Sequence, residues 1–528
     1  VKTTLDLKIQ KNLEKQFDTM FSSGQPELAG FKNGASAIED VKTGQIIALV
    51  GSRDFKYPGF GQDNAATAYI QPGSTIKPFV YAKLFDNKGQ DSINYGSGSV
   101  LPDTKITLPE YNNYSPDNAD KQFRGNINVR KSLGTSRNIP AIKAMIASGV
   151  QPTLESIRKM GNTFYCTQGI EKTTAGPASA IGGCGTRVID HTNGFASLAR
   201  LGMYKPHSDI LEVRNNSGEV LEKYENEQKR VLNSQAAYIV NDILADSQAR
   251  SGLINTSVTP SMDSIGARVS IKTGTSDLGG EAKDLWTVGY TPSLSMSVWL
   301  GNPNIQTLLD NNSTIPARIL DPALAYATEQ YRKQGKAKQG EWYKRPSGIQ
   351  EISSELYPSY YDKKNATANT KIKFDKLSKY RATDCTPENA VVEIGVIKTK
   401  DPITKKSVFI APDGYNATKE DDRHSCDDQK PTIDGVTISD NVITVRVGRG
   451  TFKLESLKVS VDGNSIASPN ISSNGTYKIP YNFSEDATIS VEVSDTGLYT
   501  TRGSAKYTAP DDTPPSNDKE DKKKKKDR

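Results

Sequence analysis

Strand patterns stand at the two ends of one long segment of this chain, and helical patterns fill the stretch between them. Residues 34–41 and 45–51 form apolar runs on either side of the turn-prone Lys42-Thr43-Gly44, which predicts a hairpin. Strand patterns return much later, at residues 268–272, 286–290 and 294–300. A single sheet therefore has to be closed from both ends of the segment. We predict an α+β fold in which helices cover an antiparallel sheet and the intervening residues form an all-helical subdomain.

The rest of the chain changes in texture along its length. A chain of 528 residues is too long for one ordinary core, and two to four units are expected. Before the α+β segment, the sequence predicts a strand and an amphipathic helix. After that segment comes a polar stretch, which we interpret as a connector with few buried residues. Short alternating strands then predict a small β-sandwich. Lys522–Lys526 form one unbroken run, which predicts a disordered tail. The predicted boundaries are 1–33, 34–345, 346–430, 431–509 and 510–528.

Charge and hydropathy narrow the possible partners. The net charge of +6 is modest, and outside the lysine-rich tail it is spread along the chain, so a nucleic-acid-binding function has little support. No uninterrupted apolar run approaches the ~18 residues of a membrane span, and there is no signal peptide. Because the chain begins with Val1, we expect a processed or truncated form whose missing N-terminus could have carried a membrane anchor.

The cysteines and histidines give no sign of a metal site. The four cysteines, Cys166, Cys184, Cys385 and Cys426, show no Cys-x-x-Cys spacing. Pairing Cys166 with Cys184 and Cys385 with Cys426 keeps the loops local and fits an oxidising compartment, although free buried thiols are an equal alternative. Only three histidines are present: His191, His207 and His424. We expect no metal and no cofactor.

The stretch Gln71-Pro72-Gly73-Ser74-Thr75-Ile76-Lys77-Pro78 precedes an apolar run with helical spacing. This pattern predicts Ser74 at or near a helix N-terminus and Lys77 one turn further on the same face. A hydroxyl beside an amine is a nucleophile with a base. Such a tetrapeptide is common in long chains and decides nothing alone.

Two further motifs follow in the same segment. Ser136-Arg137-Asn138 lies at a polar junction between helical patterns, and Lys272-Thr273-Gly274-Thr275 ends a strand pattern. The second motif offers a positive charge and two hydroxyls, with a glycine that permits close approach to the backbone. Lys42-Thr43-Gly44 has the same first three letters, but strand patterns flank it and no hydroxyl follows, so we interpret it as a turn. The order and joint occurrence of the three motifs carry the signal.

In this order the motifs resemble those of the transpeptidase domain of class A penicillin-binding proteins. Residues 112–138 and 283–301 are also similar to that family, and the resemblance covers about residues 1–347. A closely similar motif set marks class A β-lactamases, with Asp where this chain has Arg137. The fold that the resemblance implies is the penicillin-binding transpeptidase fold, followed here by the β-sandwich-like domain.

The resemblance assigns a role to each motif residue. It implies that Ser74 is acylated, Lys77 is its base, Ser136 relays protons and Asn138 hydrogen-bonds the donor peptide. It implies that Lys272 adds positive charge and supports the proton network, that Thr273 and Thr275 hold the substrate carboxylate beside Gly274, and that the N–H groups of Ser74 and Thr275 form an oxyanion hole. A lysine that acts as a base has to be neutral near pH 7, although the ordinary pKa of lysine is ~10.4. Burial of Lys77 next to the positive charge of Lys272 would lower its pKa and so favour the neutral form.

The implied function is a peptidoglycan D,D-transpeptidase that β-lactams inhibit covalently. Its expected partners are a D-alanyl-D-alanine stem peptide, an amine acceptor, β-lactam antibiotics and possible wall or cell-division proteins. The resemblance also implies an upstream membrane anchor and glycosyltransferase domain, and a location on the extracytoplasmic face of the bacterial membrane, at the cell wall.

Two alternatives remain open. The site could hydrolyse its acyl-enzyme, as a D,D-carboxypeptidase or a β-lactamase does, although no clear Glu-x-x-x-Asn element is present for β-lactam deacylation. The chain could also be a sensor that binds β-lactam or peptidoglycan without cross-linking.

Overall fold

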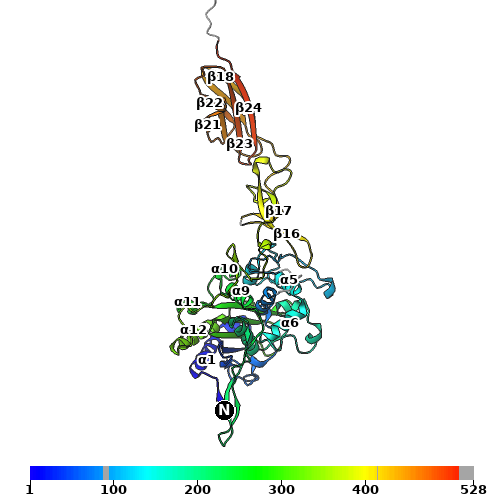
Figure 1. The fold of residues 1–528 in the computed structure, drawn as a ribbon, viewed down its shortest axis with the longest axis vertical. Helices are drawn as coiled ribbons and strands as arrows, with labels where there is room; N and C mark the ends of the chain where they lie inside the picture. The colour runs from blue at the N-terminus through cyan, green and yellow to red at the C-terminus, as the bar shows by residue number, and fades with distance from the viewer. Residues whose placement is uncertain (87–93, 413, 511–528) are drawn as a thin grey trace, which may run out of the picture. The chain divides into compact units, whose positions relative to one another are not determined.

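The computed structural model describes residues 1–86, 94–412 and 414–510, which form two compact units (Figure 1). Unit 1 consists of Val1–Thr367 together with Lys398–Val408. Unit 2 consists of Ala368–Ile397 and the chain from Phe409 onward. The predicted disordered tail lies almost wholly outside the described residues.

An antiparallel sheet with the strand order β3-β2-β10-β9-β8 is the centre of unit 1. Residue Val298 in the middle of β10 pairs with Ser36 of β2 and with Thr287 of β9, so strands from both ends of the segment lie next to each other. The predicted sheet is confirmed. Its strands are β2 (Asn33–Asp40), β3 (Ile46–Val50), β8 (Ser270–Leu278), β9 (Glu281–Tyr290) and β10 (Leu294–Gly301).

Helices α1 (Leu7–Phe21) and α12 (Ala317–Lys333) lie side by side and cover one face of this sheet (Figure 1). The carboxylate of Asp6 caps α1 by accepting hydrogen bonds from the N–H groups of Lys8 and Ile9. Apolar side chains one turn apart in α1 are buried: Ile9, Leu13, Phe17 and Met20. These helices close the side of the sheet away from the motif residues.

Helix α8 (Val188–Ala199) covers the other face, and the helical subdomain lies beyond it. That subdomain contains α3 (Lys77–Phe85), α4 (Val129–Gly134), α5 (Asn138–Ser148), α6 (Val150–Lys159) and α9 (Ser234–Ala245). Their apolar faces share one core with the end of β9. The shorter helices are α2 (Gln25–Ala29), α7 (Glu171–Thr174), α10 (Ser247–Arg250) and α11 (Pro260–Ser264).

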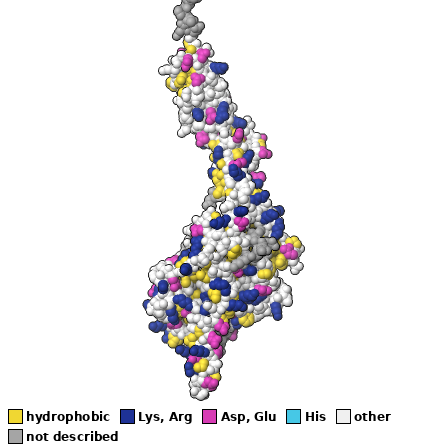
Figure 2. Space-filling model, in the orientation of Figure 1, with side chains coloured by type: hydrophobic (Ala, Val, Ile, Leu, Met, Phe, Trp, Pro, Cys, Tyr) yellow, Lys and Arg dark blue, Asp and Glu magenta, His cyan; other side chains and the backbone are white. Residues whose placement is uncertain are grey.

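Small strands complete unit 1 at its surface. They are β1 (Lys2–Thr3), β4 (Met203–Tyr204), β5 (Ile210–Arg214), β6 (Val220–Lys223), β7 (Lys229–Arg230), β11 (Gln350–Ile352) and β12 (Glu355–Tyr357). On the face drawn in Figure 2, basic and acidic side chains are interspersed over this unit. This mixture agrees with the spread-out charge of the sequence.

A five-stranded sheet of order β16-β15-β13-β14-β17 belongs to unit 2, except for residues 398–400 of β15 and 407–408 of β16, which are part of unit 1. Its strands are β13 (Thr370–Asp375), β14 (Tyr380–Arg381), β15 (Val391–Lys400), β16 (Ser407–Ile410) and β17 (Asn416–Glu420). Phe374, Val396 and Ala417 form a buried cluster on it. The structure therefore differs from the expected connector with little core, because alternate side chains of short polar strands still build a small core.

Two packed sheets follow, with the orders β18-β19-β22 and β21-β20-β23-β24. Alternating burial along β19, β20 and β23 places one apolar core between them, which confirms the small β-sandwich. The strands are β18 (Thr432–Ser439), β19 (Val442–Gly448), β20 (Leu454–Val461), β21 (Asn464–Ala467), β22 (Gly475–Pro480), β23 (Ala487–Asp495) and β24 (Thr500–Tyr507).

Of the alternatives left open for the cysteines, the structure has the two local disulfides, Cys166–Cys184 in unit 1 and Cys385–Cys426 in unit 2. Within residues 1–86, 94–412 and 414–510, no helix combines the length and the apolar character that crossing a bilayer requires.

Candidate active site

Ser74 lies in a short 3-10 helix, η2 (Gly73–Ile76), which runs directly into α3 at Lys77. The predicted α-helical start is thus shifted by one turn. Gly73 has a φ of +53°, and a Cβ at this position would lie 2.2 Å from the carbonyl oxygen of Thr275. Only glycine fits there, so η2 packs directly against the backbone of β8.

The side chain of Lys77 is completely buried. Its Nζ lies 2.5 Å from the carbonyl oxygen of Ser136, 2.7 Å from Asn138 Oδ1 and 3.4 Å from Ser136 Oγ. Burial, reinforced by the positive charges of Lys272 and Arg137, holds the pKa of Lys77 well below its usual range. A neutral amine has two N–H groups and a lone pair. The two short contacts use the N–H groups and leave the lone pair free to accept a proton.

Lys272 reaches the same place from strand β8. Its Nζ donates to Ser136 Oγ at 2.9 Å and to the carbonyl oxygen of Thr273 at 2.7 Å. Burial, with a smaller contribution from the charge of Arg250, lowers the pKa of Lys272 to about 7. The hydroxyl of Ser136 therefore lies between two amines that both lose their protons more easily than an exposed lysine.

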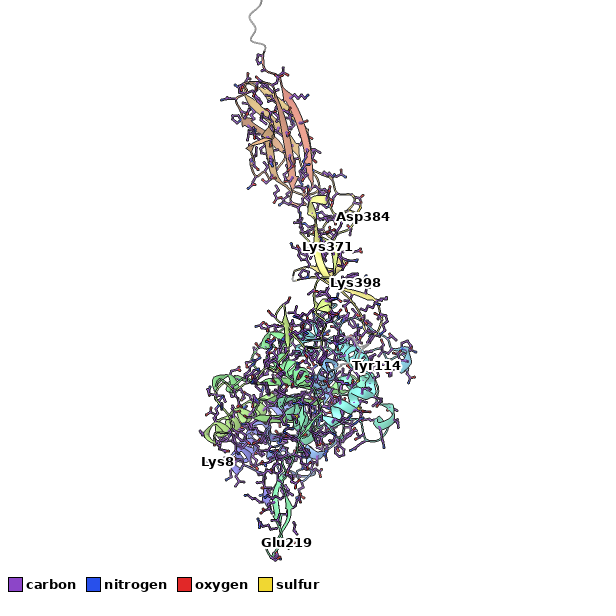
Figure 3. The ribbon with its side chains drawn as sticks, viewed as in Figure 1. Lys8, Tyr114, Glu219, Lys371, Asp384 and Lys398 are labelled. Atoms are coloured by element: carbon purple, nitrogen blue, oxygen red, sulfur yellow. A yellow bond between two sulfur atoms is a disulfide. The ribbon has the colours of Figure 1, made fainter. Side chains whose placement is uncertain are left out.

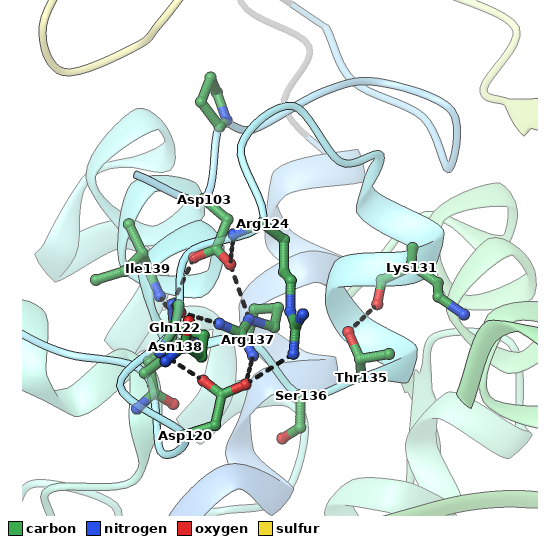
Figure 4. A network of polar contacts seen from close by, with 12 residues as sticks. Asp103, Asp120, Gln122, Arg124, Lys131, Thr135, Ser136, Arg137, Asn138 and Ile139 are labelled. Atoms are coloured by element: carbon green, nitrogen blue, oxygen red, sulfur yellow. Dashed lines mark hydrogen bonds and ion pairs between the residues drawn. The ribbon is translucent and has the colours of Figure 1, made fainter. Parts of the chain in front are cut away.

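The junction Ser136-Arg137-Asn138 links α4 to α5 in a constrained conformation. Ser136 has a φ of +58°, which is uncommon for a residue with a side chain. Arg137 fixes the junction: its guanidinium donates to Asp103 and Asp120, each at 2.8 Å, and to the carbonyl oxygen of Gln122 (Figure 4). Arg137 is thus an anchor for the strained serine.

The backbone of Asn138 is held by the same loop. Its N–H donates to Asn118 Oδ1 at 2.8 Å, and Asn118 donates to buried Asp103 at 2.7 Å. The side-chain Nδ2 of Asn138 donates to the carbonyl oxygen of Asp117 at 2.9 Å. Both ends of the Asn138 amide bind protein groups here, so its observed contact is with Lys77, and its role toward a substrate stays a prediction.

Sequence reasoning missed these supporting residues. Residues 95–125 are rich in Asn, Asp, Pro, Gly and Tyr, a composition typical of surface loops, yet Asp103 and Asn118 in this segment are buried. The segment has almost no regular secondary structure, and hydrogen bonds between side chains that are distant in sequence leave no periodic pattern.

His191 on α8 is a second residue that the sequence did not indicate. Its Nε2 lies 2.8 Å from Thr75 Oγ1, next to Ser74, and its Nδ1 lies 2.6 Å from Asn162 Oδ1. Complete burial lowers the pKa of His191 to about 3, so the ring is neutral at physiological pH. It helps to fix the position of η2, although it contacts neither Ser74 nor Lys77 among the described hydrogen bonds.

The third motif forms the edge of the sheet facing η2. A Cβ on Gly274 would lie 2.7 Å from the carbonyl oxygen of Pro72 and 2.8 Å from the backbone nitrogen of Thr75. Glycine at this position therefore lets β8 approach η2. Thr273 is buried and Thr275 is partly exposed. The structure thus places the edge Thr273-Gly274-Thr275 beside the segment that carries Ser74.

The first Lys-Thr-Gly copy is a turn, as predicted. Asp40 Oδ1 accepts hydrogen bonds from the N–H groups of Lys42 and Thr43, and Gly44 has a φ of +84°. This copy connects β2 to β3.

Comparison with known proteins agrees with this geometry. The model of the penicillin-binding protein transpeptidase domain matches residues 34–325, more than half of the chain. The chain belongs to this family. The matched range includes all the motif residues and the central sheet except Asn33 at the start of β2.

Several named relatives are similar to the chain in sequence. Penicillin-binding protein 1F of Bacillus subtilis is 27% identical over 67% of this chain and 46% of its own length. Penicillin-binding protein 2D of the same organism is 28% identical over 60% of this chain and 42% of its own length. Penicillin-binding protein 1A of Neisseria meningitidis is 26% identical over 61% of this chain. The chain spans less than half the length of each of these relatives.

Solved structures of the family share the fold. The penicillin-binding protein PonA1 from Mycobacterium tuberculosis has a TM-score of 0.53 at 22% identity, covering 68% of this chain and 90% of its own. Its complex with penicillin V has a TM-score of 0.51 at 21% identity, covering 66% of this chain and 91% of its own. At this identity the likeness shows the fold alone.

Proposed function

We propose that this family member is a D,D-transpeptidase that cross-links peptidoglycan through an acyl-enzyme on Ser74. The observation that carries the proposal is the state of Lys77. This amine is completely buried, has cations rather than a bound carboxylate around it, and contacts the second motif directly and the third through Ser136. A lysine held neutral one turn from a serine is suited to accept the serine proton.

In the acylation step, Ser74 Oγ bonds to the carbonyl carbon of the penultimate D-alanine while Lys77 Nζ takes the hydroxyl proton. The carbonyl oxygen becomes an oxyanion that faces the backbone N–H groups of Ser74 and Thr275. One such donor typically contributes ~2.7–4 kcal/mol to the transition state. When the peptide C–N bond breaks, the proton passes from Lys77 through the Ser136 hydroxyl to the departing D-alanine amine.

In the transfer step, the amine of a second stem peptide attacks the ester carbonyl. Its proton returns along Ser136 and Lys77, and Ser74 Oγ leaves as a hydroxyl. Thr273 and Thr275 hold the substrate carboxylate at the edge of β8, where Lys272 adds positive charge and Gly274 permits close approach. A β-lactam acylates Ser74 by the same route, but its leaving nitrogen stays attached and blocks the acceptor.

The groups around the two lysines disfavour a β-lactamase activity. Among the described residues, no carboxylate forms a hydrogen bond or ion pair with Ser74, Lys77, Ser136 or Lys272. Asp103, the one carboxylate whose charge acts on Lys77, is already bound by Arg137 and Asn118. Fast hydrolysis of a β-lactam at a serine site needs a carboxylate that activates water, so these surroundings support a long-lived β-lactam adduct.

The proposed location is the extracytoplasmic face of the membrane, with stem peptides of the cell wall as partners. Two disulfides support this location, because disulfides persist in oxidising compartments. Membrane anchoring and contacts with wall or cell-division proteins stay predictions.

Mass spectrometry after treatment with a fluorescent penicillin tests the acyl-enzyme. We expect one adduct, on the peptide that contains Ser74, and none on a Ser74→Ala variant. Thr67→Ala is a matched control, because it removes an exposed hydroxyl from the loop that leads to Ser74. An adduct on another residue, or none on the folded chain, would overturn the assignment.

A second assay separates transfer from its alternatives. The chain is incubated with a stem pentapeptide ending in D-Ala-D-Ala and with an amine acceptor, and the products are separated by mass. A cross-linked product supports the transpeptidase. A tetrapeptide acid alone indicates a carboxypeptidase, and an acyl-enzyme that never turns over indicates a sensor.

A further inference from the structure

Three buried side chains converge in unit 2, apart from the active site. Asp375 ends β13, Asp421 follows β17, and His424 lies three residues later. One donor atom from each lies within 4.8 Å of the other two. His424 Nδ1 is 2.7 Å from Asp421 Oδ2 and 3.7 Å from Asp375 Oδ1.

The hydrogen bond made by Nε2 of His424 shows whether Nδ1 of the neutral ring holds a proton or a lone pair. His424 Nε2 lies 2.9 Å from the carbonyl oxygen of Gly497, in the turn between β23 and β24. A carbonyl oxygen only accepts hydrogen bonds, so Nε2 holds a proton. In a neutral ring, Nδ1 then presents a lone pair to two carboxylates. The cluster therefore requires a cation at Nδ1, either a second proton or a metal ion.

Asp375 has surroundings that favour a metal ion over a second proton at this position. Its residue is completely buried, and Oδ1 forms no hydrogen bond with any described residue. Its Oδ2 already accepts from the N–H groups of Leu377 and Ser378. One N–H at His424 Nδ1 can serve Asp421 well but leaves Asp375 Oδ1 buried without a partner, which is unfavourable for a charged group.

The charge balance points the same way. Within the described part of the chain, no lysine or arginine forms an ion pair with Asp375 or Asp421. Two carboxylates around one imidazolium leave a net negative charge in a buried place. A divalent cation with a neutral histidine balances both carboxylates and gives Asp375 Oδ1 a bond.

We propose that Asp375, Asp421 and His424 bind one divalent metal ion of the zinc type. Zinc bonds of about 2.0–2.2 Å place tetrahedral donor atoms about 3.4 Å apart, and the separations of 2.7 and 3.7 Å bracket this value. Binding releases the Nδ1 proton to solvent, if present, and water takes the fourth position.

The neighbours of these donors resemble the usual support of a metal site. A metal-binding histidine commonly donates its other N–H to a backbone carbonyl, as His424 does to Gly497. Thr386 donates to Asp421 Oδ2 at 2.7 Å and orients that carboxylate. The ion would tie the five-stranded sheet to the turn of the sandwich, next to the disulfide Cys385–Cys426.

Zinc titration of the full chain tests the site. After treatment with a chelator and its removal, calorimetry with Zn²⁺ should give one site per chain, and elemental analysis should find one zinc after dialysis. Asp375→Asn and His424→Gln should each lower the affinity at least tenfold. Asp384→Asn is a matched control, because it removes an exposed carboxylate from the loop between β14 and β15 (Figure 3).

Several outcomes would overturn the proposal. Absence of zinc binding by the unsubstituted chain identifies the cation as a proton, and this measurement does not depend on whether a variant folds. Binding that persists in both Asp375→Asn and His424→Gln places the metal elsewhere. Equal binding of Mg²⁺ and Zn²⁺ excludes the nitrogen-containing site. Co²⁺ added to the unsubstituted chain should give the absorption bands of a four-coordinate nitrogen and oxygen site.

Discussion

Lys77 and Lys143 are two completely buried lysines of unit 1 with opposite surroundings. Lys143 Nζ donates to Asp401 Oδ2 at 2.6 Å and to the carbonyl oxygen of Pro102 at 2.6 Å. Lys77 Nζ instead contacts a carbonyl and an amide oxygen, and its charged neighbours are mainly cations. Neither side chain is exposed to solvent, so the difference between the two lysines comes from the groups that they contact.

Burial lowers the pKa of both lysines, but only Lys143 has a bound carboxylate that opposes the shift. The pKa of Asp401 is lowered in turn, because Lys143 and two backbone N–H groups outweigh its burial. We therefore interpret Lys143 as a charged structural anchor and Lys77 as a neutral base. The following changes test that distinction.

Replacing Lys77 has the largest expected effect on chemistry. Lys77→Met should lower the rate of acylation by a fluorescent penicillin at least ~10³-fold, because the serine proton then has no acceptor. Lys143→Met, compared per folded molecule, should acylate within about threefold of the unsubstituted chain. Rapid labelling of Lys77→Met would remove Lys77 from the proposed mechanism.

Replacing Lys143 has the largest expected effect on folding. Lys143→Met leaves Asp401 buried without its cation and should lower the free energy of unfolding of unit 1 by ~3–5 kcal/mol. Urea unfolding followed by tryptophan fluorescence isolates this unit, because Trp286, Trp299 and Trp342 all belong to it.

The double variant Lys143→Met with Asp401→Asn is the matched control for that experiment. Its amide keeps the oxygen that accepts from the N–H groups of Ile403 and Thr404, and it removes the charge. We expect it to recover more than half of the lost stability. If it is as unstable as the single variant, the loss comes from packing rather than from the ion pair.

The two Lys-Thr-Gly copies allow a smaller, internal test. Thr273→Val should lower acylation about tenfold to a hundredfold, which corresponds to losing a ~1.5–3 kcal/mol hydrogen bond to a charged carboxylate. Thr43→Val, in the turn between β2 and β3, should change acylation by less than about twofold. Equal losses in the two variants would contradict the assignment of Thr273 to the substrate.

The smallest effect concerns pH. With Lys272 titrating at a pKa of about 7, acylation that needs its charge should decline as pH rises through that value. The positive charge of Arg250 holds this pKa down, so Arg250→Gln should raise it and move the decline to higher pH by up to about one unit. Arg268→Gln, which removes an exposed arginine paired with Asp242, should not move it. Acylation rates from pH 5 to 10 measure both.

Regular elements and local motifs were predictable from the sequence. The alternating patterns predicted the hairpin and the central sheet, because side-chain periodicity records which face of a strand is buried. The three motifs predicted Ser74, Lys77, Ser136, Asn138 and Lys272–Thr275 as site residues. The structure brings Lys77, Ser136, Asn138 and Lys272 into hydrogen-bond contact and packs η2 against β8.

Pairs of polar residues far apart in the sequence were not predictable. Arg137 with Asp103, and Lys143 with Asp401, join a helix or its N-cap to an irregular segment, and the two carboxylates lie outside any periodic pattern. His424 is similar: we expected no metal from three scattered histidines, and the convergence on Asp375 appears only once the strands are paired. Such contacts form only when folding brings distant segments together, so no local sequence pattern indicates them.

The path of residues 398–408 bears on how this protein can be divided. The chain leaves unit 1 after Thr367, returns to it for Lys398–Val408, and leaves again. A fragment that ends at residue 345 or 367 thus lacks Asp401, and its buried Lys143 has lost the carboxylate that pairs with it. Recombination that exchanges everything after residue 367 would carry part of unit 1 away with unit 2. The two compact units are interleaved along the sequence, so a single crossover point cannot exchange one of them intact.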